Sequence, residues 1–317
     1  MNSNKSGFIK GGYVVRDYLI NFFKEFDYPA EAREELLAAY DTIMSCDETR
    51  AMYETQLEIY QTTNGYNCGK VAEMSVLVCR ACPVHEFHSQ LIIHILFSRH
   101  LRELYEAKGI SMEIYHNSMM DLKYKLYECK EVHGVWGSFV GSWFDGFFFL
   151  ERFALGRLQF EEVPYPAHFP VYDKHGVHLD NTKTILNVHI PSGSKLPYES
   201  VIDSYKQAYE FYKQHLIDGK LVIMAESWLL YDKLPEIIGE GTNTYKFVKD
   251  YELFHSNEDP GYGDCWRLFG KYYNGNPDDL PADSGMRRRI VEWLKSGKHM
   301  GGGEGIAIFD GEKVINK

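Results

Sequence analysis

The sequence predicts an α+β protein in which an all-α bundle over residues 1–150 is followed by an α/β domain over residues 151–317. Three observations lead to this prediction. Apolar residues before Leu150 recur at helical spacing, whereas later segments alternate or are short and β-branched. Segments of strand character then alternate with helical segments, which favours an α/β layer. The length of 317 residues also suits two domains, because single cores stop growing near ~250–300 residues.

The first half is predicted as consecutive helices joined by short breakers. Residues 13–26 place their apolar side chains near one helical stripe, and Pro29 stands where a first-turn proline is tolerated. Asn64-Gly65, Cys82-Pro83 and Gly109 separate the later segments. The predicted helices cover residues 13–26, 30–46, 48–62, 71–80, 85–107 and 111–129.

The second half is predicted to alternate strands and helices. Residues 184–190 are β-branched and apolar and stop at Pro191, and residues 221–225 form the short apolar run of a buried strand. The three glycines at 301–303 are interpreted as a flexible connector. Strands are predicted at 157–163, 184–190, 221–225, 251–255, 265–269 and 305–309, and helices at 198–216, 235–238, 242–249 and 284–296.

Composition narrows the classes of partner. The chain has 45 acidic and 34 basic residues and a net charge of −11, which argues against a nucleic-acid footprint. The segment 1–10 lacks the apolar core of a secretory signal, and no stretch approaches the ~18 apolar residues of a membrane helix. Six scattered cysteines without a signal favour reduced thiols. We therefore expect a cytoplasmic protein whose partners are small molecules, with no nucleic acid and no membrane; the sequence does not indicate an oligomeric state.

The segment Leu186–Leu196, LNVHIPSGSKL, is a candidate anion site. A strand that ends in a Pro/Gly/Ser loop and leads into a helix directs backbone N–H groups at one point, where the helix dipole adds positive charge. Lys195 could add a full charge. The alternative is a plain turn between strand and helix. The loop is neither GxGxxG nor a Walker A sequence, so a nicotinamide or nucleoside-triphosphate function has no direct support.

A second candidate lies at the ends of two predicted strands. Glu226 and Ser227 follow the strand 221–225, and His189 closes the strand 184–190. In open α/β sheets, ligands collect beyond the carboxyl ends of strands. If the two strands are neighbours, these residues face one site, where a His beside a Glu can act as general base. The alternative is that His189 is a hydrogen-bonded core residue. Ser227 as an acyl nucleophile is disfavoured, since the G-x-S-x-G elbow is absent.

Cysteine and histidine also recur in the order Cys79, Cys82, His85 and His88. These are zinc ligand types, but strong zinc patterns separate two ligand pairs by a dozen or more residues. Pro83 further interrupts the run. Helix capping and core thiols are the preferred interpretation, and we expect no metal; a metal-dependent hydrolase is the less favoured alternative.

With these residues in view, the chain resembles GNAT-like acyltransferase proteins that pair a helical N-terminal domain with a GNAT-like C-terminal domain. The resemblance covers about residues 150–309, and the helical first half fits the rest of the family pattern. The matching segments are Gly156–Glu161, Val188-His189-Ile190-Pro191 with Gly193 and Leu196, Asp203-Ser204, Ser227–Leu230, Thr242-Asn243-Thr244 and Arg287–Gly305.

The resemblance implies a GNAT-like α/β domain with a mixed central sheet and an acyl-CoA co-substrate in a notch between two splayed parallel strands. It implies acyl transfer to an amine or similar acceptor. For this reaction we expect Glu226 or His189 to act as base, directly or through a water, and Tyr245 or Tyr251 to act as acid for the departing thiolate. The usual Arg/Gln-x-x-Gly-x-Gly/Ala pyrophosphate loop is missing, and the segment 191–195 would substitute for it. The alternative is a GNAT-shaped module that binds a ligand or partner without turnover. The predicted cofactor-binding residues are Ile190, Ser192, Gly193, Ser194, Lys195 and Asn243.

Overall fold

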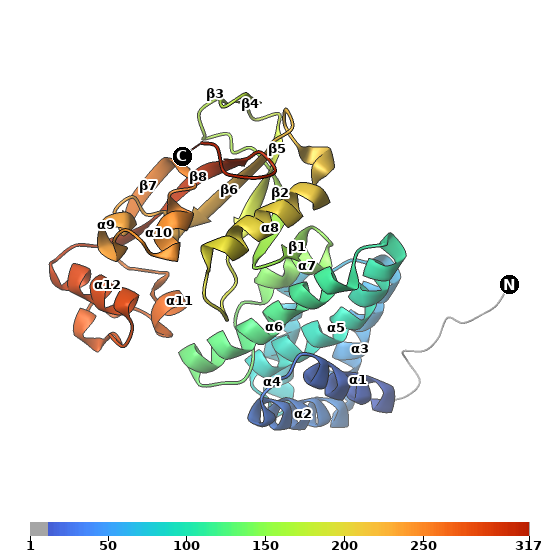
Figure 1. The fold of residues 1–317 in the computed structure, drawn as a ribbon. Helices are drawn as coiled ribbons and strands as arrows, with labels where there is room; N and C mark the ends of the chain where they lie inside the picture. The colour runs from blue at the N-terminus through green and yellow to red at the C-terminus, as the bar shows by residue number, and fades with distance from the viewer. Residues whose placement is uncertain (1–11, 317) are drawn as a thin grey trace. The chain divides into compact units, whose positions relative to one another are not determined.

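The computed structural model describes residues 12–316. The chain divides into two compact units, Met1–Glu151 and Arg152–Lys317. The polar segment 1–10, which is predicted not to be a secretory signal, lies outside the described residues. Each unit has its own secondary-structure class, all-α in the first and α/β in the second (Figure 1).

The first unit is helical throughout its described part, as predicted. Its centre is α5, whose residues from Ser89 to Ser98 are all buried. The ring nitrogen of His85 accepts the backbone N–H of Phe87 at its start, and Gly109 ends it in the left-handed conformation with φ of 68°. The helices are α1 (Gly12–Glu25), α2 (Ala30–Ser45), α3 (Asp47–Thr63), α4 (Cys68–Ala81), α5 (Glu86–Lys108), α6 (Met112–His133), η1 (Gly141–Phe144) and α7 (Asp145–Phe148).

The second unit is built on a six-stranded sheet in the order β1-β2-β5-β6-β8-β7. The pair β5–β6 is parallel and the other four pairs are antiparallel, so the predicted mixed sheet is confirmed. The strands are β1 (Arg152–Leu155), β2 (Leu158–Pro164), β5 (Thr184–His189), β6 (Leu221–Ser227), β7 (Glu252–Asp259) and β8 (Met300–Phe309), with a separate hairpin of β3 (Tyr172–Lys174) and β4 (Val177–Leu179).

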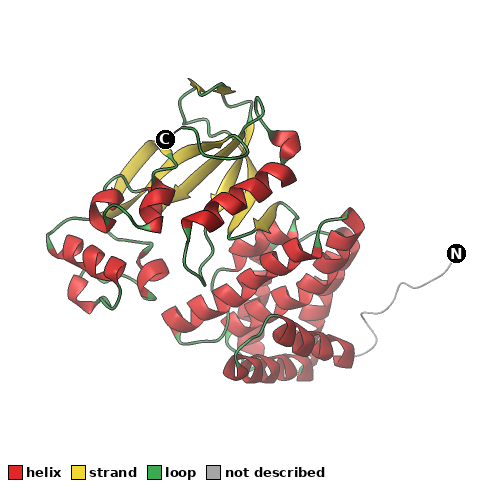
Figure 2. Ribbon diagram, in the orientation of Figure 1, coloured by secondary structure: helices red, strands yellow, loops and turns green. Residues whose placement is uncertain are grey.

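Helices connect these strands, and Figure 2 shows α8 (Tyr198–Phe211) lying along the sheet. On α8, Val201 and Tyr205 are fully buried. A cluster of buried hydrophobic residues joins Leu179 of the β3–β4 hairpin to Ile185 of β5 and Met224 of β6. The remaining helices are η2 (Lys213–His215), η3 (Trp228–Leu230), α9 (Leu234–Ile238), α10 (Asn243–Val248), α11 (Cys265–Phe269), η4 (Pro277–Asp279) and α12 (Gly285–Lys295).

Two predicted elements of the second unit are wrong. Cys265–Phe269 is helix α11, not a strand. Its two buried residues, Cys265 and Phe269, are four apart, so a five-residue apolar segment fits either period. Gly301–Gly303 is not a connector but part of β8. A Cβ on Gly303 would lie 2.1 Å from the carbonyl oxygen of Leu230, so this strand needs glycine for a close backbone approach.

Candidate functional site

The parallel pair at the centre of the sheet separates at its carboxyl end. Two register pairs join the strands, Leu186 with Ile223 and Asn187 with Met224. Among the described residues this ladder extends no further, although β5 stays paired with β2 as far as His189 and β6 with β8 as far as Ser227. The two strands therefore splay beyond Asn187 and Met224, which leaves main-chain edges without a neighbouring strand.

His189 lies at this opening with a charged partner. Its Nε2 is 2.7 Å from Oε1 of Glu161 on β2, and both side chains are largely buried. The other carboxylate oxygen of Glu161 accepts from Nε of Arg152 on β1 at 2.9 Å. Arg152 on β1 lies directly opposite Glu161 on β2, and His189 on β5 lies diagonally opposite Glu161. Side chains that are opposite or diagonal across neighbouring strands lie on the same face, so all three groups share one face of the sheet.

The electrostatic environment keeps Glu161 ionised. Burial alone would raise the pKa of this carboxyl group, but the hydrogen bond from His189 and the charge of Arg152 outweigh burial and lower its pKa to about 2. An ionised Glu161 accepts hydrogen bonds only, so the contact fixes a proton on Nε2 of His189. A proton taken up by this imidazole therefore goes to Nδ1, and the resulting cation lies against a carboxylate.

Asn187 completes the polar group at the point where the strands separate. Its Nδ2 donates to Oε1 of Glu161 at 3.3 Å. Its Oδ1 is buried and accepts no hydrogen bond from any described residue. A buried acceptor without a donor is costly, so this atom suits an N–H group brought by a ligand.

The predicted anion loop leads from β5 into α8. Gly193 has φ of 96°, in the region that favours glycine. Arg157 fixes the loop, because its Nε and Nη2 donate to the carbonyl oxygens of Lys195 at 3.0 Å and Ser194 at 2.9 Å. The backbone N–H groups of residues 192–195 donate to no acceptor within the described chain. The loop thus presents free donors beside the first turn of α8, which has no side-chain cap.

Glu226 and Ser227 occupy different positions at the end of β6. The β5–β6 register places Glu226 on the same face of the sheet as His189, and it is exposed. Its cross-strand neighbour Glu304 is held by His168, whose Nε2 lies 2.7 Å from Oε2. Ser227 points to the other face by alternation, and its Oγ accepts the N–H of Leu229 as the cap of η3.

The candidate acids differ in exposure. Tyr245 lies on α10, and its hydroxyl is 3.4 Å from Oε1 of Glu240; burial and that carboxylate raise its pKa. Tyr251 is buried with its hydroxyl 2.9 Å from that of Tyr205, and burial raises its pKa strongly. Tyr251 therefore belongs to the core. Asn243 is the exposed first residue of α10, after the capping Thr242.

No group of three or more His, Cys, Asp or Glu side chains within residues 12–316 is arranged to hold a metal ion. Cys79 is exposed near the end of α4, whereas Cys82 is buried and follows that helix. His85 caps α5. None of the helices in the described part of the chain combines the length and the apolar character that crossing a membrane requires.

Glu161, Arg152 and Arg157 are site residues that the sequence alone does not identify. Glu161 carries a signal, because it is a charged residue between the apolar Phe160 and Val163 in a predicted strand. Its partner cannot be read from one strand, since the contact depends on how β2 and β5 are registered. Arg157 lies in a segment that matches the family pattern, but its target is the loop 38 residues later.

Two family models match the chain, one in each unit. Residues 17–149 match the N-acyltransferase N-terminal domain, and residues 153–307 match the GNAT-like C-terminal domain. No curated protein matches the chain.

Solved acyltransferase structures share the fold. An acyltransferase in complex with decanoyl-CoA is 18% identical with a TM-score of 0.69, over 92% of this chain and 87% of that one. A mutant acyltransferase with octanoyl-CoA is 18% identical with a TM-score of 0.68, over the same 92% and 87%. An acyltransferase with decanoyl-CoA and teicoplanin is 17% identical with a TM-score of 0.66, again over 92% and 87%.

Proposed function

The chain belongs to the GNAT-like acyltransferase proteins that join a helical N-acyltransferase N-terminal domain to a GNAT-like C-terminal domain, and on that premise we propose that it transfers an acyl group from an acyl-CoA to an amine acceptor. The observation that supports this most directly is the separation of β5 and β6 beside the His189–Glu161 pair. Structures of the same fold carry acyl-CoA ligands, which supports a thioester as the donor.

The donor would bind where the two strands part. A pantetheine amide can add to the open edge of β5 as a strand does, and Oδ1 of Asn187 can accept one of its N–H groups. The pyrophosphate would take the N–H groups of residues 192–195, with Lys195 supplying a positive charge. Arg157 keeps that loop in place through the carbonyls of Ser194 and Lys195. Asn243 is a further candidate contact to the cofactor, as the resemblance implies, and Ile190 offers main-chain groups.

The base would be His189. The amine nitrogen attacks the thioester carbonyl carbon, a C–N bond forms, and the C–S bond breaks to release CoA thiolate. His189 takes the amine proton at Nδ1, and Glu161 stabilises the imidazolium that forms. Arg152 in turn keeps Glu161 ionised and oriented. Holding the thioester beside the acceptor accounts for much of the rate.

The remaining predicted residues take supporting roles in this proposal. Glu226, exposed on the face of His189, would attract a cationic amine, which gives one proton to water before its neutral form attacks the thioester. Tyr245 would donate the proton that the thiolate needs, since a phenol is protonated at neutral pH. Ser227 caps η3, so we assign it no chemical step.

The proposal also covers the cellular compartment and the binding partners of the chain. All six cysteines are free thiols, which suits a reducing compartment such as the cytoplasm. The partners would be a small-molecule acyl donor and a small-molecule amine; one relative of the same fold was solved with teicoplanin.

The proposal is tested by measuring CoA release from acetyl-, octanoyl- and decanoyl-CoA in the presence of a panel of primary amines. Turnover that depends on both substrates supports it. CoA binding without turnover for any amine would favour the alternative, a GNAT-shaped binding module. If no acyl-CoA gives a heat of binding and none stabilises the protein against thermal unfolding, the acyltransferase and the binding-module interpretations both lose their basis.

A further inference from the structure

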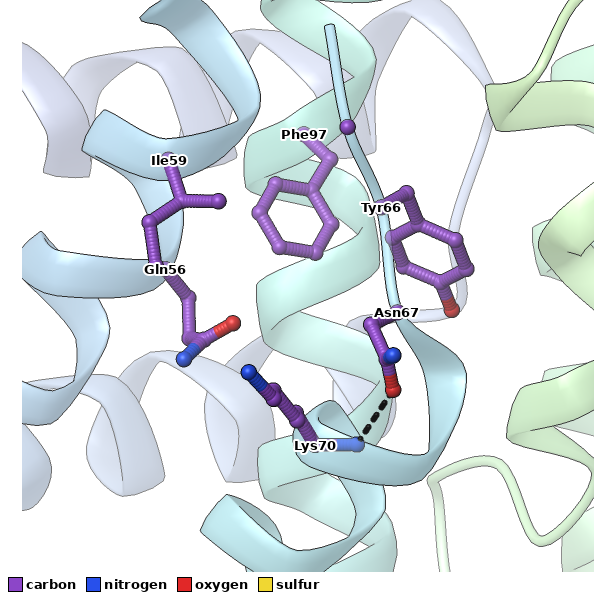
Figure 3. A pocket seen from close by; sticks show the side chains of 7 residues that line it. Gln56, Ile59, Tyr66, Asn67, Lys70 and Phe97 are labelled. Atoms are coloured by element: carbon purple, nitrogen blue, oxygen red, sulfur yellow. Dashed lines mark hydrogen bonds between the residues drawn. The ribbon is translucent and has the colours of Figure 1, made fainter. Parts of the chain in front are cut away.

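The helical unit contains a pocket that the proposed reaction does not use. It has a volume of 190 Å³ and lies between α3, the start of α4 and α5 (Figure 3). All the residues that line it belong to the first unit, whereas His189 and the anion loop belong to the second. It must therefore be explained separately.

The inner surface of this pocket is apolar. Phe97 of α5 and Tyr66 of the α3–α4 connection are buried beside it, and Ile59 of α3 is 41% exposed at its rim. The rings of Tyr66 and Phe97 are 5.6 Å apart and meet edge to face. An apolar cavity of about 150 Å³ accepts benzene. This pocket therefore has room for an aromatic ring or a six-carbon chain.

The pocket is formed in advance of any ligand, because its loop wall is fixed at both ends. Nε2 of His100 lies 2.8 Å from Oδ1 of Asn64, and Oδ1 of Asn67 accepts the N–H of Lys70 at 2.9 Å. The hydroxyl of Tyr66 is hydrogen-bonded to the fully buried His94, which fixes the ring that faces the pocket. A wall held by caps and a buried hydrogen bond loses little freedom when a ligand enters.

The open side of the pocket is positive. Lys70 stands in the first turn of α4, where the aligned N–H groups disfavour a cation, and that turn contains no acidic residue. Among the described residues Lys70 forms no ion pair. In Figure 3 its amino end points across the opening toward the side-chain amide of Gln56. An uncompensated lysine and a helix N-terminus thus meet beside an apolar surface.

We propose that this pocket binds a small monocarboxylate with an apolar body of about six or seven carbons. The apolar body lies against Ile59, Tyr66 and Phe97, and the carboxylate accepts hydrogen bonds from Nζ of Lys70 and Nε2 of Gln56. The inference does not depend on the acyl-transfer proposal, since it uses neither the sheet nor the anion loop.

Calorimetric titration of the full chain with hexanoate, benzoate and the neutral hexan-1-ol tests the proposal. Hexanoate or benzoate should bind roughly tenfold or more tightly than hexan-1-ol at low salt, because a charge-assisted hydrogen bond is strong. Lys70→Met should remove this preference, and Lys70→Arg should restore most of it. Lys108→Met, which removes an exposed lysine at the end of α5, is the matched control and should change nothing.

Two further measurements decide where the anion binds. Gln56→Trp fills the opening and should abolish binding of both acids while circular dichroism stays unchanged. Saturating CoA should leave the affinity for hexanoate as it was. The proposal is overturned if the acids bind no tighter than hexan-1-ol, if Lys70→Met binds them like the wild type, or if CoA displaces them, since they would then occupy the donor site.

Discussion

Nε2 of His189 donates a hydrogen bond of 2.7 Å to Oε1 of Glu161 along a diagonal of the antiparallel pair β2–β5. Glu161 is directly opposite Asn187, so the contact joins residues that are offset by two positions along β5. This pairing gives His189 a fixed orientation and a proton on Nε2. It also stands at the point where β5 loses its neighbour β6, which is where a thioester is proposed to bind.

Removing the imidazole should therefore abolish the chemical step without removing the donor. We expect His189→Ala to lower kcat by roughly 10²–10⁴-fold, the usual contribution of a general base. The affinity for CoA, measured by calorimetry, should stay within about twofold, because none of the proposed cofactor contacts uses the imidazole of His189. Equal losses of turnover and CoA affinity would mean that His189 serves binding, not proton transfer.

The contribution of Glu161 to the free energy of unfolding should decrease at acid pH. The pKa of this carboxyl group is lowered in the folded state to about 2, from 4.5. Its stabilising contribution is thus complete above pH 4.5 and is lost as the pH falls toward 2. Glu161→Gln should lower the free energy of unfolding at pH 7 by on the order of 2–3 kcal/mol. That difference should shrink between pH 4.5 and 2.

Glu162→Gln is the matched control for this measurement, because Glu162 is the next residue on the same strand and forms a more exposed ion pair with His215. Its effect should be about 0–1 kcal/mol at neutral pH. Urea unfolding at pH 7, 4 and 3 compares the three proteins. A gap between wild type and Glu161→Gln that stays constant over this range would contradict the assigned ionisation.

Much of the fold is predictable because it follows from local periodicity. Long helices such as α5 and strands such as β5 repeat their pattern over enough residues to be recognised. Short elements escape prediction. β1 has four residues and β3 and β4 have three each, and α11 was predicted as a strand.

The candidate site also has a part that the sequence predicts and a part that it does not. His189, Glu226 and the loop after β5 follow from strand ends, which a sequence reveals. His189 contacts Glu161 and not Glu226 because of the β2–β5 register, which one strand alone does not reveal. Arg157 binds the carbonyl oxygen of Ser194, and that contact joins residues 37 positions apart in the sequence. The glycines of β8 show the same limit, since the need for them appears only when β8, η3 and β7 are seen together.

The loop after β5 gives an electrostatic prediction. Lys195→Glu reverses the charge beside the free N–H groups of residues 192–195 and should weaken CoA binding roughly tenfold at low salt. The loss should shrink at high salt, because exposed charges are screened. Lys206→Glu, an exposed residue further along α8, is the control and should have a smaller effect. An unchanged affinity in Lys195→Glu at low salt would argue against phosphate binding in this loop.

The close approach of β8 to the segment after β6 gives a last prediction. A Cβ at position 303 would lie 2.1 Å from the carbonyl oxygen of Leu230, a backbone atom that cannot rotate away. Gly303→Ala should therefore force β8 from its register with Ser227 and lower the free energy of unfolding by roughly 2–3 kcal/mol. Gly285→Ala, at a glycine of α12 whose Cβ would meet nothing within 4 Å, should instead be neutral or stabilise by up to about 1 kcal/mol. Urea unfolding of the two variants compares them directly. Equal stability of the two variants would show that β8 tolerates a side chain at position 303.

CoA binding should follow the same order. Because residue 303 pairs with Ser227 at the end of β6, Gly303→Ala should also weaken CoA binding, whereas Gly285→Ala should leave it intact.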